Sequence, residues 1–180
     1  TVIGGCVVGL AAVLSAIVLG AEVTVIDNKP EKLEYFYERF EGAVRTLPSY
    51  PDVVAESLAA SDLAVGAVLV TGLRAPKVIT KEMIAGMEPG SVFVDVAIDQ
   101  GGCAETSRPT THDAPVYTKY GVTHYCVTNM PALVSQTSTY ALSNAILPYV
   151  VLAADGRVEE TPALRKGINI DAGELKIALY

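Results

Sequence analysis

TVIGGCVVGLAAVLSAIVLGAEVTVID, residues 1–27, is the stretch of sequence that decides the fold. Val2-Ile3 indicates a short strand, the glycines after it indicate a tight turn, and a helix is predicted from about Val8 to Leu19. Residues 22–26 (EVTVI) are rich in β-forming side chains and predict a second strand that ends at Asp27. This order of elements is typical of the first βαβ unit of a parallel sheet.

Residues 1–21 contain no charged side chain, which is also a property of membrane-spanning helices and signal sequences. Four glycines interrupt this stretch, and neither a basic segment nor a small-residue cleavage site flanks it. We therefore expect a buried strand, a turn and a helix, and no membrane partner.

The composition is that of a folded domain with a sizeable core. The 180 residues are 51% hydrophobic and 18% charged, which excludes a disordered chain. The net charge of −7 argues against a nucleic-acid partner, because the neutralisation of phosphates needs clustered Lys and Arg. Three cysteines without a CxxC pair favour the reducing cytoplasm. Two distant histidines give no metal-ligand spacing, so no metal site is expected.

The rest of the sequence continues to alternate between strands and helices. Strands are expected at residues 44–47, 63–70, 92–97 and 124–127. Helices are expected at about 51–60, 80–87 and 138–152, the last interrupted by Pro148. Another helix is expected from Pro30, with Asn28 as its cap, because apolar residues at 33, 36, 37 and 40 share one helical face. The pattern predicts an α/β fold of the Rossmann type, a doubly wound parallel sheet.

The glycine turn is the first candidate site. Residues 4–9 (GGCVVG) lie between a predicted strand and a predicted helix, which is the context that a dinucleotide-binding fingerprint requires. In such a turn the backbone approaches a pyrophosphate closely, at the positive end of the helix. Cys6 replaces the middle glycine of the G-x-G-x-x-G pattern, and its side chain would point into the space where the pyrophosphate packs. A tight turn without a ligand is the alternative.

Asp27 follows the second predicted strand, where an acidic residue accepts hydrogen bonds from the ribose hydroxyls of adenosine. A carboxylate at this position also repels a 2′-phosphate, so the predicted cofactor is NAD rather than NADP. The alternative role of Asp27 is to cap the helix that starts at Pro30, and the two roles are compatible.

A second candidate site is the stretch DVAIDQGGCAETSRPTTH, residues 95–112, where a short apolar strand runs into a loop dense in polar groups. Ligands of α/β domains bind at the carboxyl ends of strands, so this loop is a candidate for catalysis. For Asp99, a simple turn residue before Gly101-Gly102 is the alternative to a functional role. We expect Asp95 to be structural and Arg108 to pair with a local carboxylate such as Glu105.

This loop resembles the signature loop of alanine dehydrogenases, enzymes that interconvert L-alanine and pyruvate with a nicotinamide cofactor. The resemblance continues, in order and spacing, through the glycine turn, Asp27, and residues 66–77 (GAVLVTGLRAPK), 125–131 (YCVTNMP) and 137–142 (TSTYAL). It covers residues 1 to about 167. Proton-translocating transhydrogenases share the glycine turn and a similar Ala-Pro-Lys loop, but they resemble residues 98–111 and 129–140 less well.

The resemblance implies reversible oxidative deamination of L-alanine to pyruvate and ammonia, with NAD as the cofactor. The implied cofactor-binding residues are Gly4, Gly5, Cys6, Val7, Val8, Gly9, Asp27, Lys32, Ser49, Val68, Leu69, Val78, Ile98, Asp99, Asn129 and Met130. Asp27, Lys32 and Ser49 would face the adenosine, and Val68, Leu69 and Val78 would form the floor under the cofactor. Asp99 would be the catalytic carboxylate during imine hydrolysis, with Asn129 and Met130 on the substrate side.

In this family the general base is a histidine and the substrate carboxylate is held by a lysine and an arginine, all three in an N-terminal substrate domain. The sequence as given resembles the cofactor-binding half. Residues 1–154 are expected to form the NAD-binding domain, and residues 155–180 a segment that returns toward the substrate domain, with a short helix at 162–166 and a terminal strand. We expect this part alone to be inactive, and the intact protein to be a homo-hexamer. The NAD(H)-binding component of a transhydrogenase and a non-catalytic NAD-binding module are the alternatives.

Overall fold

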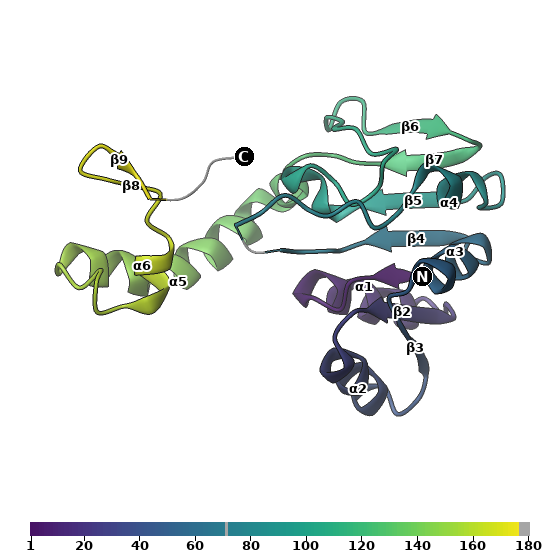
Figure 1. Ribbon diagram of the computed structural model, residues 1–180, viewed down its shortest axis with the longest axis horizontal. Coiled ribbons are helices and arrows are strands. Elements are labelled where there is room, and N and C mark those ends of the chain that lie inside the picture. Colours follow the sequence, from purple (N-terminus) through teal and green to yellow (C-terminus); the bar gives the residue numbers. More distant parts are fainter. Residues whose placement is uncertain (71, 177–180) are drawn as a thin grey trace. The chain divides into compact units, whose positions relative to one another are not determined.

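A mainly parallel sheet organises the first part of the chain (Figure 1). Its strands are β1 (Val2–Ile3), β2 (Val23–Asp27), β3 (Val44–Pro48), β4 (Leu63–Gly66), β5 (Val92–Asp95), β6 (Val116–Lys119) and β7 (Val122–Tyr125). The spatial order is β3-β2-β1-β4-β5-β7-β6, and within this sheet only the β6–β7 pair is antiparallel. The chain thus winds outward from β1 in one direction and returns to the other side of β1 with β4. This topology confirms the predicted doubly wound Rossmann-type sheet.

The computed structural model describes residues 1–70 and 72–176. The chain divides into two units, Thr1–Asn129 and Met130–Tyr180. The expected domain boundary after residue 154 remains a prediction. Thr71, from an expected loop, and residues 177–180, from the expected C-terminal segment, lie outside the described residues.

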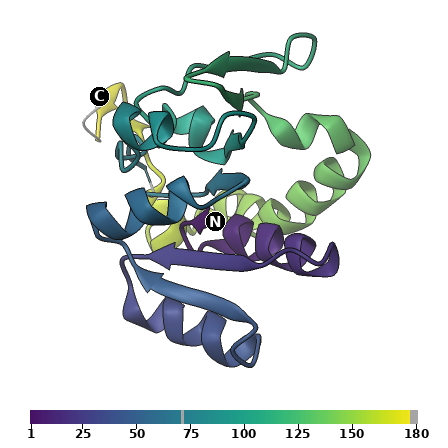
Figure 2. The same cartoon turned by 90° about the vertical axis from the view of Figure 1, so that its right-hand side faces the viewer.

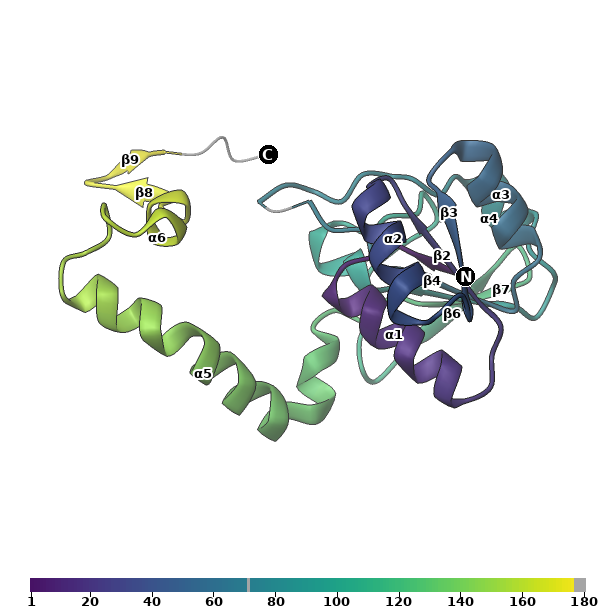
Figure 3. The same ribbon diagram turned by 90° about the horizontal axis from the view of Figure 1, so that it is seen from below.

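Helices cover both faces of the sheet. Their bounds are α1 (Val7–Val18), α2 (Pro30–Arg39), α3 (Pro51–Ala59) and α4 (Lys81–Ala85). Figure 3 shows α1 and α2 on one side of the sheet and α3 and α4 on the other, and Figure 2 gives a second view of these layers. Because successive strand residues point to opposite faces, Val2 packs in the cluster under α1 and α2, whereas Ile3 packs under α3 and α4.

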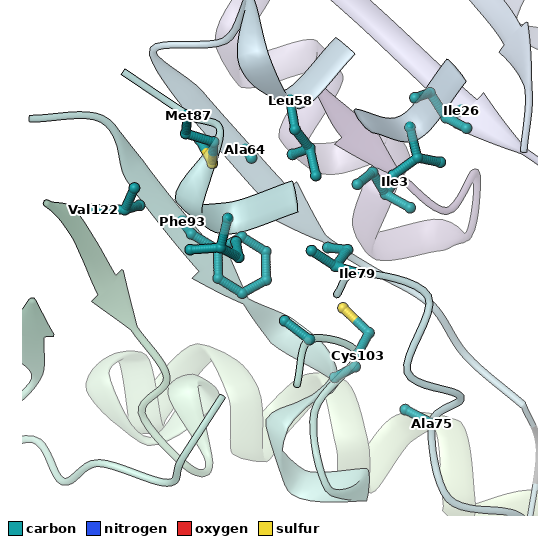
Figure 4. Packing of buried hydrophobic residues seen from close by; sticks show 14 residues of the cluster. Ile3, Ile26, Leu58, Ala64, Ala75, Ile79, Met87, Phe93, Cys103 and Val122 are labelled. Atoms are coloured by element: carbon teal, nitrogen blue, oxygen red, sulfur yellow. The ribbon is translucent and has the colours of Figure 1, made fainter. Parts of the chain in front are cut away.

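The core under α3 and α4 is the larger of the two clusters (Figure 4). It brings together Ile3, Leu58, Phe93 and Ile84, each with 2% of its surface exposed or less. Burial of a side chain of this size stabilises the fold by about 1.5–3 kcal/mol. This core lies directly beneath the carboxyl ends of β4 and β5, so it gives the loops at that edge a rigid support.

Two expected strands end earlier than the sequence indicates. The strand expected at 63–70 is confined to β4, because Gly66 pairs with the last residues of both neighbouring strands, Ile3 and Asp95. The strand expected at 92–97 ends at Asp95, whose carboxylate accepts a hydrogen bond from the Ala97 amide (3.0 Å) and starts the 3₁₀ helix η1 (Val96–Gln100). The loops at this edge are therefore longer than predicted.

The antiparallel strand β6 was missed by the sequence analysis. It pairs with β7 through a two-residue turn in which Tyr120 and Gly121 both have positive φ angles of 55° and 78°. Positive φ at both central positions is typical of the type I′ hairpin turn. The prediction of Asn28 as the cap of α2 was also wrong, because α2 begins after Lys29.

The second unit consists of η2 (Met130–Val134), α5 (Ser135–Ala154), α6 (Pro162–Lys166) and the hairpin of β8 (Ile170–Asp171) and β9 (Glu174–Leu175). The helix expected at 138–152 is longer than predicted and continues through Pro148. The predicted helix at 162–166 is confirmed as α6. Of the helices that the structure describes, none combines the length and apolar character needed to cross a membrane.

His124 on β7 is fully buried, and its hydrogen bonds define which ring nitrogen carries the hydrogen. Its Nδ1 lies 3.0 Å from the carbonyl oxygen of Val122, which only accepts, so Nδ1 carries the ring hydrogen. Nε2 then accepts from the hydroxyl of Thr106 at 2.9 Å. Burial lowers the pKa of His124, and the nearby positive charges of Lys119 and Arg108 act in the same direction.

We therefore expect His124 to make stability depend on pH. Near pH 7.5 the ring is neutral in both the folded and the unfolded chain. As the pH falls below about 6.5, the unfolded chain binds a proton that the folded chain does not, so the free energy of unfolding decreases. Urea midpoints measured between pH 7.5 and 5.5 should fall more steeply for the wild type than for His124→Gln. Parallel pH profiles of the two proteins would contradict this assignment.

Candidate functional site

The predicted site residues of the first unit gather at the carboxyl edge of the sheet. Gly4 follows β1, Ser49 follows β3, and Ala67 follows β4, next to Gly4. The chain reverses its direction of winding between β1 and β4. In doubly wound sheets, ligands bind in the crevice outside the strand ends at such a switch point.

The glycine turn is built by close backbone contacts. Gly4 has a φ of 107°, and a side chain there would collide with the carbonyl oxygen of Ala67. A side chain at Gly9 would collide with the carbonyl oxygen of Gly4, so the first turn of α1 can pack tightly on the end of β1 only with glycine at position 9.

The amino end of α1 is suited to an anion. Its cap residue, Cys6, makes no side-chain capping hydrogen bond, and the first turn contains no acidic residue. The first amides of a helix have no partner inside the helix, and the helix dipole makes this end positive. Val7 and Val8 are 85% and 45% exposed, so this helix end is accessible. These are features that the sequence analysis expects of a pyrophosphate site, and the pyrophosphate assignment itself stays a prediction.

The thiol of Cys6 contacts the segment that follows β4. Its Sγ lies 3.1 Å from the carbonyl oxygen of Ala67 and donates a hydrogen bond to it. The side chain is half-buried and crosses from the end of β1 to the end of β4. The turn therefore accommodates the side chain of Cys6 at the middle glycine position of the G-x-G-x-x-G pattern, while Gly4 and Gly9 make the close backbone contacts.

Asp27 connects the glycine turn to α2. Its carboxylate accepts hydrogen bonds from the amides of Gly5 (2.6 Å) and Lys29 (2.9 Å), and the ammonium of Lys32 lies 3.6 Å away. Asp27 is 7% exposed, and its carbonyl oxygen accepts from the amide of Ser49. Asp27, Lys32 and Ser49, all predicted to face the adenosine, therefore lie close together.

The predicted apolar floor comes from the segment between β4 and α4. Val68 and Val78 are half-buried and pack against the core cluster under α3 and α4, whereas Leu69 is 57% exposed. This arrangement offers an apolar surface beside the glycine turn, because Val68 directly follows Ala67.

Asp99 and Asn129 come together from separate loops. Both carboxylate oxygens of Asp99 accept from the amide of Asn129, at 3.0 and 3.3 Å, and the Asp99 side chain is exposed. Nε2 of His112 lies 3.3 Å from the carbonyl oxygen of Asn129. Ile98 is only 3% exposed and anchors the turn before Asp99. Met130 begins the second unit, so its predicted place on the substrate side remains a prediction.

The expected pairing of Arg108 with Glu105 is wrong. The guanidinium of Arg108 instead lies 4.0 Å from the ring centroid of Tyr117, in a cation–π contact, and Tyr117 in turn stacks on His124. The carboxylate of Glu105 accepts from the amide of Lys81 at the start of α4. Aromatic residues on a strand that was not predicted explain why the sequence analysis missed this stack.

Asp95 is structural, as expected, and is fully buried. Its carboxylate accepts hydrogen bonds from the amides of Ala97 and Cys103 and from the hydroxyl of Ser107. Burial, together with the negative charge of Asp95, raises the pKa of the Cys103 thiol, so this thiol stays protonated at neutral pH. In the sequence, the only signal of this network is the carboxylate of Asp95 on an apolar strand, followed further on by Gly101 and Gly102.

The family model for "Alanine dehydrogenase/PNT, C-terminal domain" matches residues 1–178. The chain belongs to this family. The alanine dehydrogenase of Halomonas elongata is 52% identical over 179 residues, and that of Bacillus subtilis is 47% identical over 180 residues. Each match covers 97% of this chain and 48% of the relative. The chain thus spans about half the length of the curated relatives that it matches.

Solved structures give the same result. An L-alanine dehydrogenase superposes with a TM-score of 0.86 at 46% identity, over 97% of this chain and 49% of that one. A transhydrogenase from Sinorhizobium meliloti gives a TM-score of 0.72 at 27% identity, over 83% of this chain and 42% of that one. The sequence resemblance to alanine dehydrogenases is thereby confirmed for the family and the fold.

The first prediction from this site concerns Asp27. Replacement by Ser removes the charge that repels a 2′-phosphate and one charge-assisted acceptor for a ribose hydroxyl. The ratio of NADP to NAD affinity should therefore rise by about 1–3 kcal/mol, on the order of 10- to 100-fold. Glu56→Ser on α3, an exposed carboxylate among residues at the amino edge of the sheet, is the control. An unchanged ratio in Asp27→Ser would show that Asp27 does not face the ribose.

The second prediction concerns Cys6. A bare Cα at this position permits the closest approach of a pyrophosphate, so Cys6→Gly should bind NAD more tightly than the wild type. Titration of both proteins with NAD measures the difference, and NAD should also protect the thiol from alkylation. Equal affinities together with an unprotected thiol would show that Cys6 lies away from the cofactor.

Proposed function

We propose that this chain is the NAD-binding half of an NAD-dependent alanine dehydrogenase. The observation that carries the proposal is the meeting of Asp99 and Asn129 at the same sheet edge as an uncapped helix end and a buried acidic residue after β2. The 52% identity to a relative named alanine dehydrogenase supports the same function.

NAD would lie along the carboxyl edge of the sheet. The amides at the start of α1 would bind its pyrophosphate, and Asp27 would accept from the adenosine ribose. Val68, Leu69 and Val78 would support the cofactor from below. From the described residues the Asp27 carboxylate accepts two backbone hydrogen bonds, and a carboxylate has about four lone-pair sites, so it retains capacity for ribose hydroxyls.

The reaction would convert L-alanine, NAD⁺ and water into pyruvate, ammonium, NADH and a proton, and would serve L-alanine catabolism. The bound nicotinamide supplies the hydride acceptor. Asp99 is exposed at the strand edge and has its carboxylate fixed by the Asn129 amide, so it can accept a hydrogen bond from the water or the amino group during imine hydrolysis. Asn129 and Met130 would flank the substrate.

The rest of the active site would come from the part of the relatives' length that this chain does not span. There the family resemblance places a histidine as the general base and a lysine and an arginine that hold the substrate carboxylate. This chain alone would then bind NAD but not turn over L-alanine, because positioning of the substrate Cα over the ring supplies much of the rate acceleration.

The second candidate function is that of the NAD(H)-binding component of a transhydrogenase, and a non-catalytic NAD-binding module is the third. The match to the transhydrogenase of Sinorhizobium meliloti favours the second candidate, but its identity of 27% is well below the 46% of the L-alanine dehydrogenase. We therefore prefer alanine dehydrogenase.

The function is tested by NADH formation from L-alanine, measured by absorbance with the full-length protein. Activity should require L-alanine and NAD, with NADP and other amino acids as controls. Asp99→Asn should lower kcat by about 10²–10⁴-fold if Asp99 takes part in proton transfer, whereas Asp113→Asn, in a nearby loop, should not. Hydride exchange between two nucleotides without L-alanine would favour the transhydrogenase, and binding of NAD without turnover would favour the non-catalytic module.

We also propose that the intact protein is a homo-hexamer in the cytoplasm. Val18 and Leu19, at the end of α1, are 84% and 86% exposed, and Leu14 beside them is 39% exposed, so this apolar face is suited to a subunit contact. Three free thiols, two of them buried, fit a reducing compartment.

Light scattering of the intact protein should give a mass several times that of one chain. Val18→Glu places a charge in the apolar face of α1 and should shift the protein toward smaller species. A monomeric wild type would contradict the proposed assembly.

A further inference from the structure

The loop that carries Asp99 has an irregular backbone. After η1, Gly101 and Gly102 both adopt positive φ angles, 91° and 76°, before the chain continues to Ala104. Such a backbone cannot satisfy its own amides and carbonyls in a regular ladder, and polar groups without partners are costly away from water. The partners of this loop therefore determine how rigidly it is held.

Asp95 accepts from the Cys103 amide of the loop, and Lys77 binds three of its carbonyl oxygens. The ammonium of Lys77 donates to the carbonyl oxygens of Gly101 (2.6 Å), Gly102 (2.8 Å) and Ala104 (3.0 Å). An ammonium group has three donors, and here each has an acceptor. Among the described residues, the Lys77 side chain takes part in no ion pair.

The segment around Lys77 is fixed to the same loop by its backbone. The amide of Ala75 donates to the carbonyl of Gln100 at 2.9 Å, and the amide of Ile79 donates to the carbonyl of Cys103 at 3.1 Å. These bonds lie on either side of Lys77 in the sequence. The backbone on both sides of Lys77 is therefore bonded to the loop, and this holds the ammonium next to the loop carbonyls.

A short path of hydrogen bonds joins Lys77 to Asp99. The amide of Gly101 donates to the carbonyl of Ile98, and the amide of Gly102 donates to the carbonyl of Ala97, both at 2.9 Å. The two glycines whose carbonyls bind Lys77 thus hold the turn in which Asp99 lies. Displacement of Gly101 would rotate the peptide between Ile98 and Asp99, and displacement of Gly102 would rotate the preceding peptide, between Ala97 and Ile98.

We infer that Lys77 is a positioning residue, which acts through the carbonyls of Gly101, Gly102 and Ala104 to hold Asp99 at the strand edge. It contacts neither substrate nor cofactor, because all of its donors are directed at the loop. Where activity is measured, the inference rests on the proposed function. The ordering of the loop by Lys77 does not depend on that function.

Lys77→Met in the full-length protein tests the inference, because it keeps an unbranched side chain of nearly the same length and removes its donors. We expect kcat with L-alanine to fall by about tenfold or more, since misplacement of a catalytic group by about 1 Å can cost on the order of 100-fold. The Kd for NADH, measured by fluorescence, should stay within about twofold, because the residues of the glycine turn and Asp27 are unchanged. Lys81→Met, at an exposed lysine four residues further along the chain at the start of α4, removes the same charge and should change neither quantity.

A double-mutant cycle separates positioning from a general loss of structure. In an Asp99→Asn background, Lys77→Met should have much less than its full effect on kcat, because the group that it positions is already disabled. Equal effects in both backgrounds would overturn the inference. A loss of NADH affinity of about tenfold or more would also overturn it, since Lys77 would then bind the ligand directly.

Hydrogen exchange gives a readout that does not depend on activity. The amides of Gly101, Gly102 and Cys103 are hydrogen-bonded and should exchange faster in Lys77→Met, whereas those of the glycine turn should not. Lys77→Arg, which keeps the charge but has a planar group, should give a smaller change and guards against misfolding of the Met variant. Unchanged loop exchange in both variants would overturn the inference. If the wild type does not oxidise L-alanine, the proposed function fails and this comparison still decides the role of Lys77 in ordering the loop.

Discussion

The close approach of three backbone segments at the end of β1 is the constraint on which the site depends. Gly4 touches the carbonyl of Ala67 on one side and the first turn of α1 on the other, and neither contact leaves room for a Cβ atom at Gly4 or Gly9. The amino end of α1 is thereby held at the point where the sheet changes its direction of winding. Every other group of the site is placed relative to this point by the order of the parallel strands.

The alternation of strands and helices, the position of Asp27 after β2 and the glycine turn were predictable because each depends on local sequence. Apolar residues with a period of two or about 3.6 and glycines between elements suffice for these features. The meeting of Asp99 with Asn129 was implied only by the family resemblance. Local patterns contain no information on which loops meet across a sheet.

The errors have physical causes that lie outside the local sequence. Residues 67–70 are apolar enough for a strand, but β1 and β5 end opposite Gly66, so no partner is left for them. The strand β6 contains only four residues, and one of its side chains, Tyr117, serves the stack under Arg108 rather than a regular core. The role of Lys77 was not predictable from the sequence, because its three carbonyl partners come together only when two loops are folded against each other.

The contact between Gly66 and Cys103 has a consequence for how this sequence can change over time. The Sγ atom of Cys103 occupies the space that a Cβ atom at Gly66 would need, and Phe93 closes the same space from another side. The volume available to positions 66 and 103 is therefore nearly constant, and cores tolerate substitutions best when total volume is conserved. A larger residue at one position is compatible with the fold only when the other becomes smaller. These two positions, 37 residues apart in the chain, are thus expected to vary as a pair among related proteins.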